Sequence, residues 1–113
     1  MTIVTHTIKL SELKQMTEHF FGDFVKAVVD IDRELLAVDA ELHADLEALL
    51  LEDGSRQRNL WGINVYPELP GEQCIEFDSM INMRPSQGNR SRGVDNGEVR
   101  EKIIRIVSKG IQQ

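Results

Sequence analysis

Three arginines stand close together in the segment INMRPSQGNRSRGVDNGE, residues 81–98 of an otherwise acidic chain. Arg84, Arg90 and Arg92 carry planar guanidinium groups, which can donate paired hydrogen bonds to a phosphate or a carboxylate. Two glycines allow close approach to the backbone, and the segment leads into the N-terminus of a predicted helix, where negative charge is favoured. We therefore predict that Arg84, Asn89, Arg90 and Arg92 bind a small anionic ligand or an acidic protein surface.

A second interpretation of these arginines is structural. Residues 1–52 hold 11 acidic and 4 basic residues, whereas residues 53–113 hold 8 acidic and 9 basic ones. The arginines can therefore pair with the acidic first half, within the domain or across a dimer, in exposed ion pairs that contribute little to stability. The segment also lacks a phosphate-binding pattern such as G-x-x-x-x-G-K-[ST].

A further group of polar residues alternates with apolar ones in two segments, ELHADLEALL at 41–50 and IEFDSMINMR at 75–84. In a strand, alternate residues lie on one face about 7 Å apart. One imidazole and two carboxylates on such a face suit Mg²⁺ or Mn²⁺, the divalent cations that we consider as a candidate cofactor. The candidate residues for this polar face or metal site are His43, Asp45, Glu47, Asp78 and Asn82, with Glu41, Asn64, Tyr66, Glu76 and Arg84 beside them.

Two alternatives to this site stay open. The polar face of an antiparallel sheet is commonly just the solvated one. Residues 41–52 also fit a helix, since Leu42, Leu46 and Leu49 follow helical spacing and the segment is rich in Ala, Leu and Glu. We favour a strand, because Asp53 and Gly54 suit a hairpin turn into the next strand; a helix would turn His43 away and dismantle the site.

Two single residues complete the candidates. Trp61 either forms the floor of a pocket or anchors the core, as buried aromatics usually do. Cys74 is the only cysteine, so an intramolecular disulfide is excluded, and we interpret it as a small structural residue of a protein in the reducing cytoplasm.

The elements that must position these residues follow from the hydrophobic pattern. We predict strands at 3–8, 25–31, 34–38, 60–66 and 75–83, and helices at 11–22 and 95–110, with Asp95 or Asn96 as the cap of the second helix. Both helices carry one apolar stripe. The prediction is therefore a single α+β domain over residues 1–113: a two-layer antiparallel β-meander with the N-terminal and C-terminal helices packed on one face.

Composition limits the function further. The net charge of -6 makes nucleic acid and anionic membranes unfavourable partners. No apolar run approaches the ~20 residues of a membrane span, and the first residues do not resemble a signal peptide. We expect a cytoplasmic protein.

The segments ELHADLEALLLEDGSRQRNLWGINVYPE and FDSMINMRPSQGNRS resemble the hallmark segments of a small bacterial family of uncharacterised domains. The resemblance extends from about residue 25 to residue 107 and implies membership of a family without an assigned activity, substrate or cofactor. The residues that these segments share with the candidate sites include Glu41, His43, Asp45, Trp61, Arg84, Asn89 and Arg90.

Our leading hypothesis is a non-enzymatic binding module that uses the Arg-rich segment and the adjacent polar face. The rival is a metal-assisted hydrolase or nuclease-like enzyme, with His43, Asp45 and Glu47 or Asp78 as ligands and an arginine that stabilises a phosphoryl oxyanion. A structural homo-oligomer that pairs through a free sheet edge is the third hypothesis.

Overall fold

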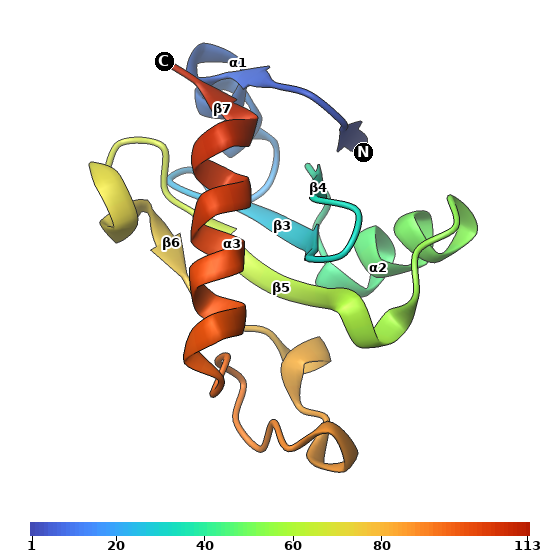
Figure 1. Cartoon of the computed structure of the whole chain (residues 1–113). Helices are drawn as coiled ribbons and strands as arrows, with labels where there is room; N and C mark the ends of the chain where they lie inside the picture. Colours follow the sequence, from blue (N-terminus) through green and yellow to red (C-terminus); the bar gives the residue numbers. More distant parts are fainter.

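The computed structural model describes residues 1–113. Five strands form an antiparallel sheet in the order β1-β4-β3-β5-β6 (Figure 1). The strands are β1 (Thr2–Val4), β3 (Val25–Asp30), β4 (Leu35–Val38), β5 (Leu60–Val65) and β6 (Ile75–Glu76). The α+β class with an antiparallel sheet is therefore confirmed. The order departs from a simple meander at two places, because β1 lies beside β4 and not beside β3, and β5 lies beside β3 and not beside β4.

Three α-helices accompany the sheet, α1 (Leu10–Met16), α2 (His43–Glu52) and α3 (Gly97–Gly110). Two further strands, β2 (Ile8–Lys9) and β7 (Ile111–Gln112), pair in parallel and join the beginning of the chain to its end. Short 3-10 helices fill the connections: η1 (Thr17–His19), η2 (Gln57–Asn59), η3 (Gly71–Cys74), η4 (Met80–Asn82) and η5 (Pro85–Gln87). None of the helices is long and apolar enough to cross a membrane.

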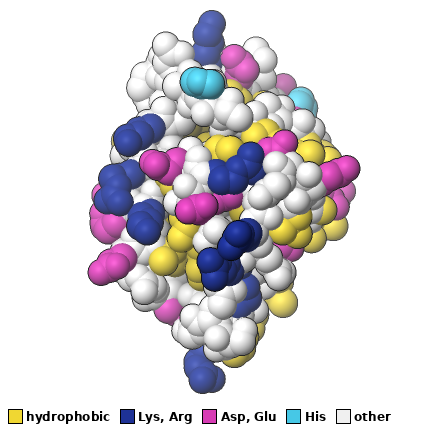
Figure 2. All heavy atoms as spheres, turned by 45° about the vertical axis from the view of Figure 1, so that its right-hand side comes forward, with side chains coloured by type: hydrophobic (Ala, Val, Ile, Leu, Met, Phe, Trp, Pro, Cys, Tyr) yellow, Lys and Arg dark blue, Asp and Glu magenta, His cyan; other side chains and the backbone are white.

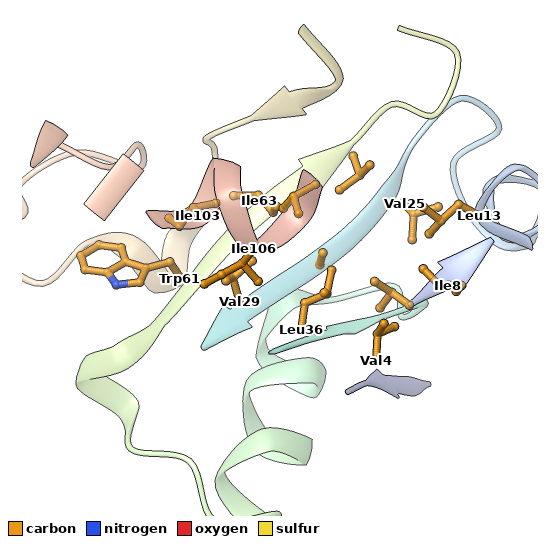
Figure 3. Close-up of a cluster of buried hydrophobic side chains, with 14 of the residues drawn as sticks. Val4, Ile8, Leu13, Val25, Val29, Leu36, Trp61, Ile63, Ile103 and Ile106 are labelled. Carbon is orange, nitrogen blue, oxygen red and sulfur yellow. The ribbon is translucent and has the colours of Figure 1, made fainter. Parts of the chain in front are cut away.

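The larger core lies between one face of the sheet and the helices α1 and α3. Figure 3 shows Val29 and Ile63 of the sheet beside Ile103 and Ile106 of α3, while Leu13 of α1 joins the same cluster. The apolar stripe of α3 provides these contacts, and Asn96 caps the helix by accepting hydrogen bonds from the backbone N–H groups of residues 98 and 99. The predicted position of both terminal helices on one sheet face is confirmed.

The opposite face of the sheet is covered by α2, so our prediction of a strand at 41–51 is wrong. Leu46 and Leu50, four residues apart, are fully buried against Val28, Ala37 and Leu60. The segment from 41 to 52 contains no β-branched residue, and its Ala, Leu and Glu residues favour helix. The alternation of Leu and Ala that suggested a strand is also compatible with a helix whose buried residues recur at i and i+4.

The predicted strand at 75–83 is also wrong beyond its first two residues. After β6 the chain leaves the sheet. Asn82, which the alternation placed on the open polar face, is fully buried in η4, and Met83, which it placed on the buried face, is 44% exposed. The Ser79 hydroxyl accepts the backbone N–H of Ile81, which starts this 3-10 turn. Side-chain hydrogen bonds with the backbone therefore override the strand pattern here.

The first predicted helix is shorter than expected. α1 begins at Leu10 with no side-chain cap, one residue before the predicted start, and it ends at Met16. The chain continues as η1 before Gly22, at φ +89°, completes the turn that leads to β3. Phe20 is half exposed as a result. Phe21 and Phe24 stack on each other, and Phe24 contacts Tyr66, the residue that follows β5.

Candidate functional site

A pocket of about 400 Å³ lies where the start of α2 meets the sheet. We call it the sheet pocket. It is lined by Lys26 of β3, Asn64 of β5, Glu76 of β6 and His43 of α2, together with Asp78, Arg92 and an apolar rim that includes Phe21, Phe24, Leu42 and Met80. Its volume and its mixture of apolar and convergent polar groups are those of a small-molecule site.

Lys26, Asn64 and Glu76 form one row across three neighbouring strands. Lys26 pairs directly with Asn64 in the β3–β5 register, and Asn64 pairs with Glu76 in the β5–β6 register. Directly opposed residues lie on the same face of a sheet, so the three side chains share the floor of the pocket. Asn64 Nδ2 donates to Glu76 Oε1 at 2.8 Å, and the Tyr66 hydroxyl donates to the same oxygen at 3.2 Å.

The other end of the Asn64 amide has no partner. Asn64 is 6% exposed, and its Oδ1 atom is buried without a hydrogen bond. A buried acceptor left without a donor costs about 1–3 kcal/mol. The floor of the sheet pocket therefore contains an acceptor that a ligand donor would satisfy.

His43 is the first residue of α2, and its imidazole is buried at the pocket wall. Its Nε2 lies 2.7 Å from the carbonyl oxygen of Ile63, so Nε2 carries the proton and donates. Burial is the main cause that lowers the pKa of His43 below its ordinary value of 6.5, and the hydrogen bond to Ile63 opposes it. The neutral ring keeps Nδ1 free of a proton, as an acceptor.

This lowered pKa predicts a stability that falls on acidification. Near pH 6.5 the imidazole of residue 43 takes up a proton in the unfolded chain, whereas in the folded protein it does so only at a lower pH. The free energy of unfolding therefore decreases as the pH falls from about 7 to about 5. In His43→Gln, urea denaturation at several pH values should show a shallower decrease. Hydrogen bonds from Ser91 and Arg90 lower the pKa of Asp95 below its ordinary value of 3.8. The protonation of Asp95 therefore affects stability only at a pH below the range of this measurement. Equal slopes in the two proteins would contradict the prediction.

Aromatic rings form one wall of the pocket. Phe21 and Phe24 are stacked with their centroids 4.5 Å apart, and Tyr66 lies 5.2 Å from Phe24. The Lys26 ammonium lies 5.1 Å from the centroid of Phe21, a cation–π distance. This wall offers an apolar surface next to a positive charge.

Of the four residues predicted to bind an anion, Arg92 is the one that reaches the sheet pocket. Its Nε forms an ion pair with Asp78 at 2.8 Å at the pocket edge, and its side chain is 56% exposed. Arg90 is exposed outside the pocket. In the view of Figure 2, basic and acidic side chains are interspersed over the surface, with apolar side chains between them.

Arg84 is occupied within the protein. Its two terminal nitrogens donate to the carbonyl oxygens of Gln57 and Leu60, and its guanidinium carbon lies 4.2 Å from the centroid of Trp61. Burial lowers the pKa of Arg84, although Glu47 nearby opposes this shift. The guanidinium therefore links the connection at 57–60 to the loop that contains Arg84. Its paired donor nitrogens are already used within the protein and do not face a ligand.

Two asparagines of the loop are structural in the same way. Asn82 Oδ1 accepts from the backbone N–H of Gly62, and its Nδ2 donates to the carbonyls of Gly62 and Arg92, at 2.8–2.9 Å. Asn89 Nδ2 donates to the carbonyls of residues 82, 91 and 93, while its Oδ1 accepts from the N–H of Asp95. Gly62 must lack a side chain, because a Cβ there would lie 2.5 Å from the Cβ of Ser79.

The predicted polar face is therefore brought together only in part. His43 and Asp78 line the sheet pocket together with Asn64 and Glu76, whereas Asp45 and Glu47 lie further along α2 and do not. No group of three His, Cys, Asp or Glu side chains lies close enough to hold a metal ion. Trp61 is 5% exposed and belongs to the larger core.

Sequence reasoning missed Lys26, Phe21 and Phe24. A signal for Lys26 was present, because it is the one charged residue within VKAVV, a strand that is otherwise apolar. A lone lysine in such a strand must either reach solvent with its ammonium or have a function. Phe21 was assigned to a helix that ends before it, and Phe24 lay in the connection between that predicted helix and the next predicted strand.

A second cleft is larger, at about 590 Å³, and lies between the end of α3 and the 67–75 segment. Cys74 lines it, and burial raises the pKa of this thiol, which keeps it in the unreactive protonated form. The charged residues at this cleft include Lys14 and Glu68, which pair with each other at 3.6 Å. The convergent polar groups belong to the smaller sheet pocket, and we place the candidate site there.

Comparison with known proteins agrees with the resemblance in the sequence. Residues 2–110 match the family described as "Protein of unknown function (DUF5674)". No curated protein and no solved structure matches the chain. Because the match extends over nearly all of the 113 residues, the chain belongs to this family of proteins of unknown function.

Proposed function

We propose that the protein is a binding domain that takes a small anionic molecule into the sheet pocket. The observation that carries the proposal is the charge of Lys26. Its ammonium lies in the pocket and forms none of the ion pairs of the structure. A half-buried lysine without a counter-ion is available to a ligand anion, and the ligand would gain a charge-assisted hydrogen bond.

The surroundings of Lys26 support an anion with an apolar or planar part. The stacked pair of Phe21 and Phe24 offers that part a flat apolar surface. Arg92 adds a second cationic group, a guanidinium, at the edge, where its terminal nitrogens are available beyond the Nε that binds Asp78. The Arg-rich segment would thus contribute to binding through Arg92, as a wall of the pocket.

The same groups favour binding over hydrolysis. The metal ligands of the rival hypothesis are not brought together, since Asp45 and Glu47 lie outside the pocket. Ser79 is the one hydroxyl in the lining, and its oxygen accepts the N–H of Ile81, while the donor nitrogen of His43 is directed to a backbone carbonyl. A nucleophile hydrogen-bonded to a base, which nucleophilic catalysis requires, would have to involve other residues.

The test is binding of simple anions to the full chain. Phosphate, acetate, benzoate and phenyl phosphate are titrated while the amide signals of residues around the pocket are followed by NMR. We expect benzoate or phenyl phosphate to bind at the pocket, and Lys26→Met to weaken that binding about 10-fold or more, the effect of losing a charged hydrogen bond of about 1.5–3 kcal/mol.

Lys102→Met is the matched control, since Lys102 is exposed on α3, which covers the opposite sheet face. It removes the same charge from the protein and should leave the dissociation constant within twofold. Two results would overturn the proposed function: none of the four anions shifts the amide signals of the pocket residues, or Lys26→Met binds the anions as tightly as the wild type.

A further inference from the structure

We infer that the ligand of the sheet pocket is zwitterionic, an amino acid with an apolar side chain, whose ammonium group binds to Asn64 and Glu76. This inference rests on the proposed function and extends it, because the proposed function requires only the anionic end. It starts from the charge of Glu76, which, like that of Lys26, forms no ion pair.

Lys26 and Glu76 are held apart although they belong to the same cross-strand row. Adjacent strands are about 4.8 Å apart, so the two Cα atoms, two strands apart, are separated by about 10 Å, a distance that two long side chains could bridge. The Lys26 ammonium instead lies over the ring of Phe21, and Glu76 Oε1 is held by Asn64 and Tyr66. The pocket thus keeps one positive and one negative charge open, on either side of a neutral amide.

The neighbouring pair behaves differently. Arg92 and Asp78 lie at the edge of the same pocket and neutralise each other at 2.8 Å. The two charges at the edge are therefore neutralised within the protein, and those of Lys26 and Glu76 are the open charges of this pocket. A ligand with a carboxylate at one end and an ammonium at the other would neutralise both.

The buried acceptor of Asn64 identifies the second end as a donor. Asn64 Nδ2 is used by Glu76, so Oδ1 needs a donor from outside the row. Lys26 and Glu76 are the cross-strand neighbours of Asn64, so the Asn64 amide lies between the two open charges, and the acceptors here are Oδ1 and the Glu76 carboxylate. An ammonium has three N–H donors and no acceptor, which suits these two acceptors.

The remaining part of the ligand is apolar. The pocket wall formed by Phe21 and Phe24 and the exposed side chains of Leu42 and Met80 at its rim would contact an aliphatic or aromatic side chain. The volume of about 400 Å³ is enough for one amino acid. The carboxylate would lie at Lys26 and Arg92, and the ammonium at Asn64 and Glu76.

Matched ligand pairs test the ammonium. Calorimetry on the full chain compares phenylalanine with 3-phenylpropionate, which lacks the amine, and with phenethylamine, which lacks the carboxylate; leucine and 4-methylpentanoate form the second pair. We expect at least one amino acid to bind 10-fold or more tightly than its deamino partner, and phenethylamine to bind more weakly than phenylalanine.

Asn64→Leu should abolish the preference for the amino form, because it removes the buried acceptor. Asn64→Leu also removes a donor to Glu76. Tyr66→Phe is the control, because it removes the other donor to Glu76 and leaves the Asn64 acceptor, and it should retain the preference. Thermal unfolding shows that each variant is folded. Deamino acids that bind as tightly as the amino acids in both pairs would overturn the zwitterion and leave the proposed function standing. Absence of binding by every amino acid, deamino acid and simple anion would overturn both.

Discussion

Replacing Asn82 by alanine is expected to lower the free energy of unfolding by about 3–5 kcal/mol, because it leaves several buried backbone groups without partners, each costing about 1–3 kcal/mol. Asn82 is fully buried. It gives Gly62 both the acceptor and the donor that a residue of a further strand would provide, at a point where β6 has already ended. Its third hydrogen bond holds the carbonyl of Arg92.

Urea denaturation followed by circular dichroism measures this loss. Gln87→Ala is the matched control, since Gln87 is an exposed amide with a single hydrogen bond, to the carbonyl of Arg58 at 3.2 Å, and should change stability by less than about 0.5 kcal/mol. If Asn82→Ala proved as mild as the control, the amide of Asn82 would not be what attaches the loop to the edge of β5.

Arg84→Ala is the second large effect, with an expected loss of about 2–4 kcal/mol. The change removes two hydrogen bonds to backbone carbonyls and a cation–π contact. A buried hydrogen bond from a charged donor is worth about 1.5–3 kcal/mol and a cation–π contact about 0.5–2 kcal/mol. One of the two hydrogen bonds is exposed and the other is only partly buried, so the expected loss is below the sum of these values. Glu47 adds to the effect. Its Oε2 is buried without a hydrogen bond, and the charge of Arg84 interacts favourably with its carboxylate, an interaction that the alanine variant loses.

Arg90→Ala separates this role from a general effect of charge. Arg90 lies in the same loop, its side chain is exposed, and its contact with Asp95 is made by its backbone N–H. We expect its replacement to change the free energy of unfolding by less than about 0.5 kcal/mol. Arg84→Lys, which keeps the charge but loses the fork, should fall near Arg84→Ala. Equal stability of the Arg84 and Arg90 variants would return Arg84 to the residues available for a ligand.

The parts of the fold that periodicity determines could be predicted from the sequence. The strands β3, β4 and β5 are buried on both faces and are recognised as short apolar runs rich in β-branched residues, while the helix α3 buries one stripe at helical spacing. Segment 41–52 failed because Leu and Ala alternate there in a way that also fits a helix, and only its contact with Val28 and Leu60 decides between the two. Segment 77–83 failed because the side chains of Ser79 and Asn82 bond to backbone groups, which a periodic pattern does not reveal.

The polar residues of the candidate site could be predicted from the sequence in part, whereas Lys26 and the aromatic wall could not. His43, Asn64, Glu76 and Asp78 were grouped on a common sheet face, and they line one pocket, although His43 arrives there from a helix. Arg84 and Asn89 were chosen for their donors, which the structure shows bound to backbone carbonyls. Whether a guanidinium faces a ligand or a carbonyl depends on contacts between residues 24–27 positions apart, and a linear pattern does not contain them.

The place of α3 in the fold has a consequence for synthesis of the chain on the ribosome. The larger core is completed by residues from 94 to 107, and β7 pairs with β2 only when residues 111 and 112 are present. While the nascent chain ends before α3, the sheet face with Val25, Ala27 and Val29 has no cover other than α1, and such an exposed apolar face is the kind that chaperones bind and that aggregates. The domain must therefore complete its folding after nearly all of its residues have left the exit tunnel, in one late step that joins its two ends.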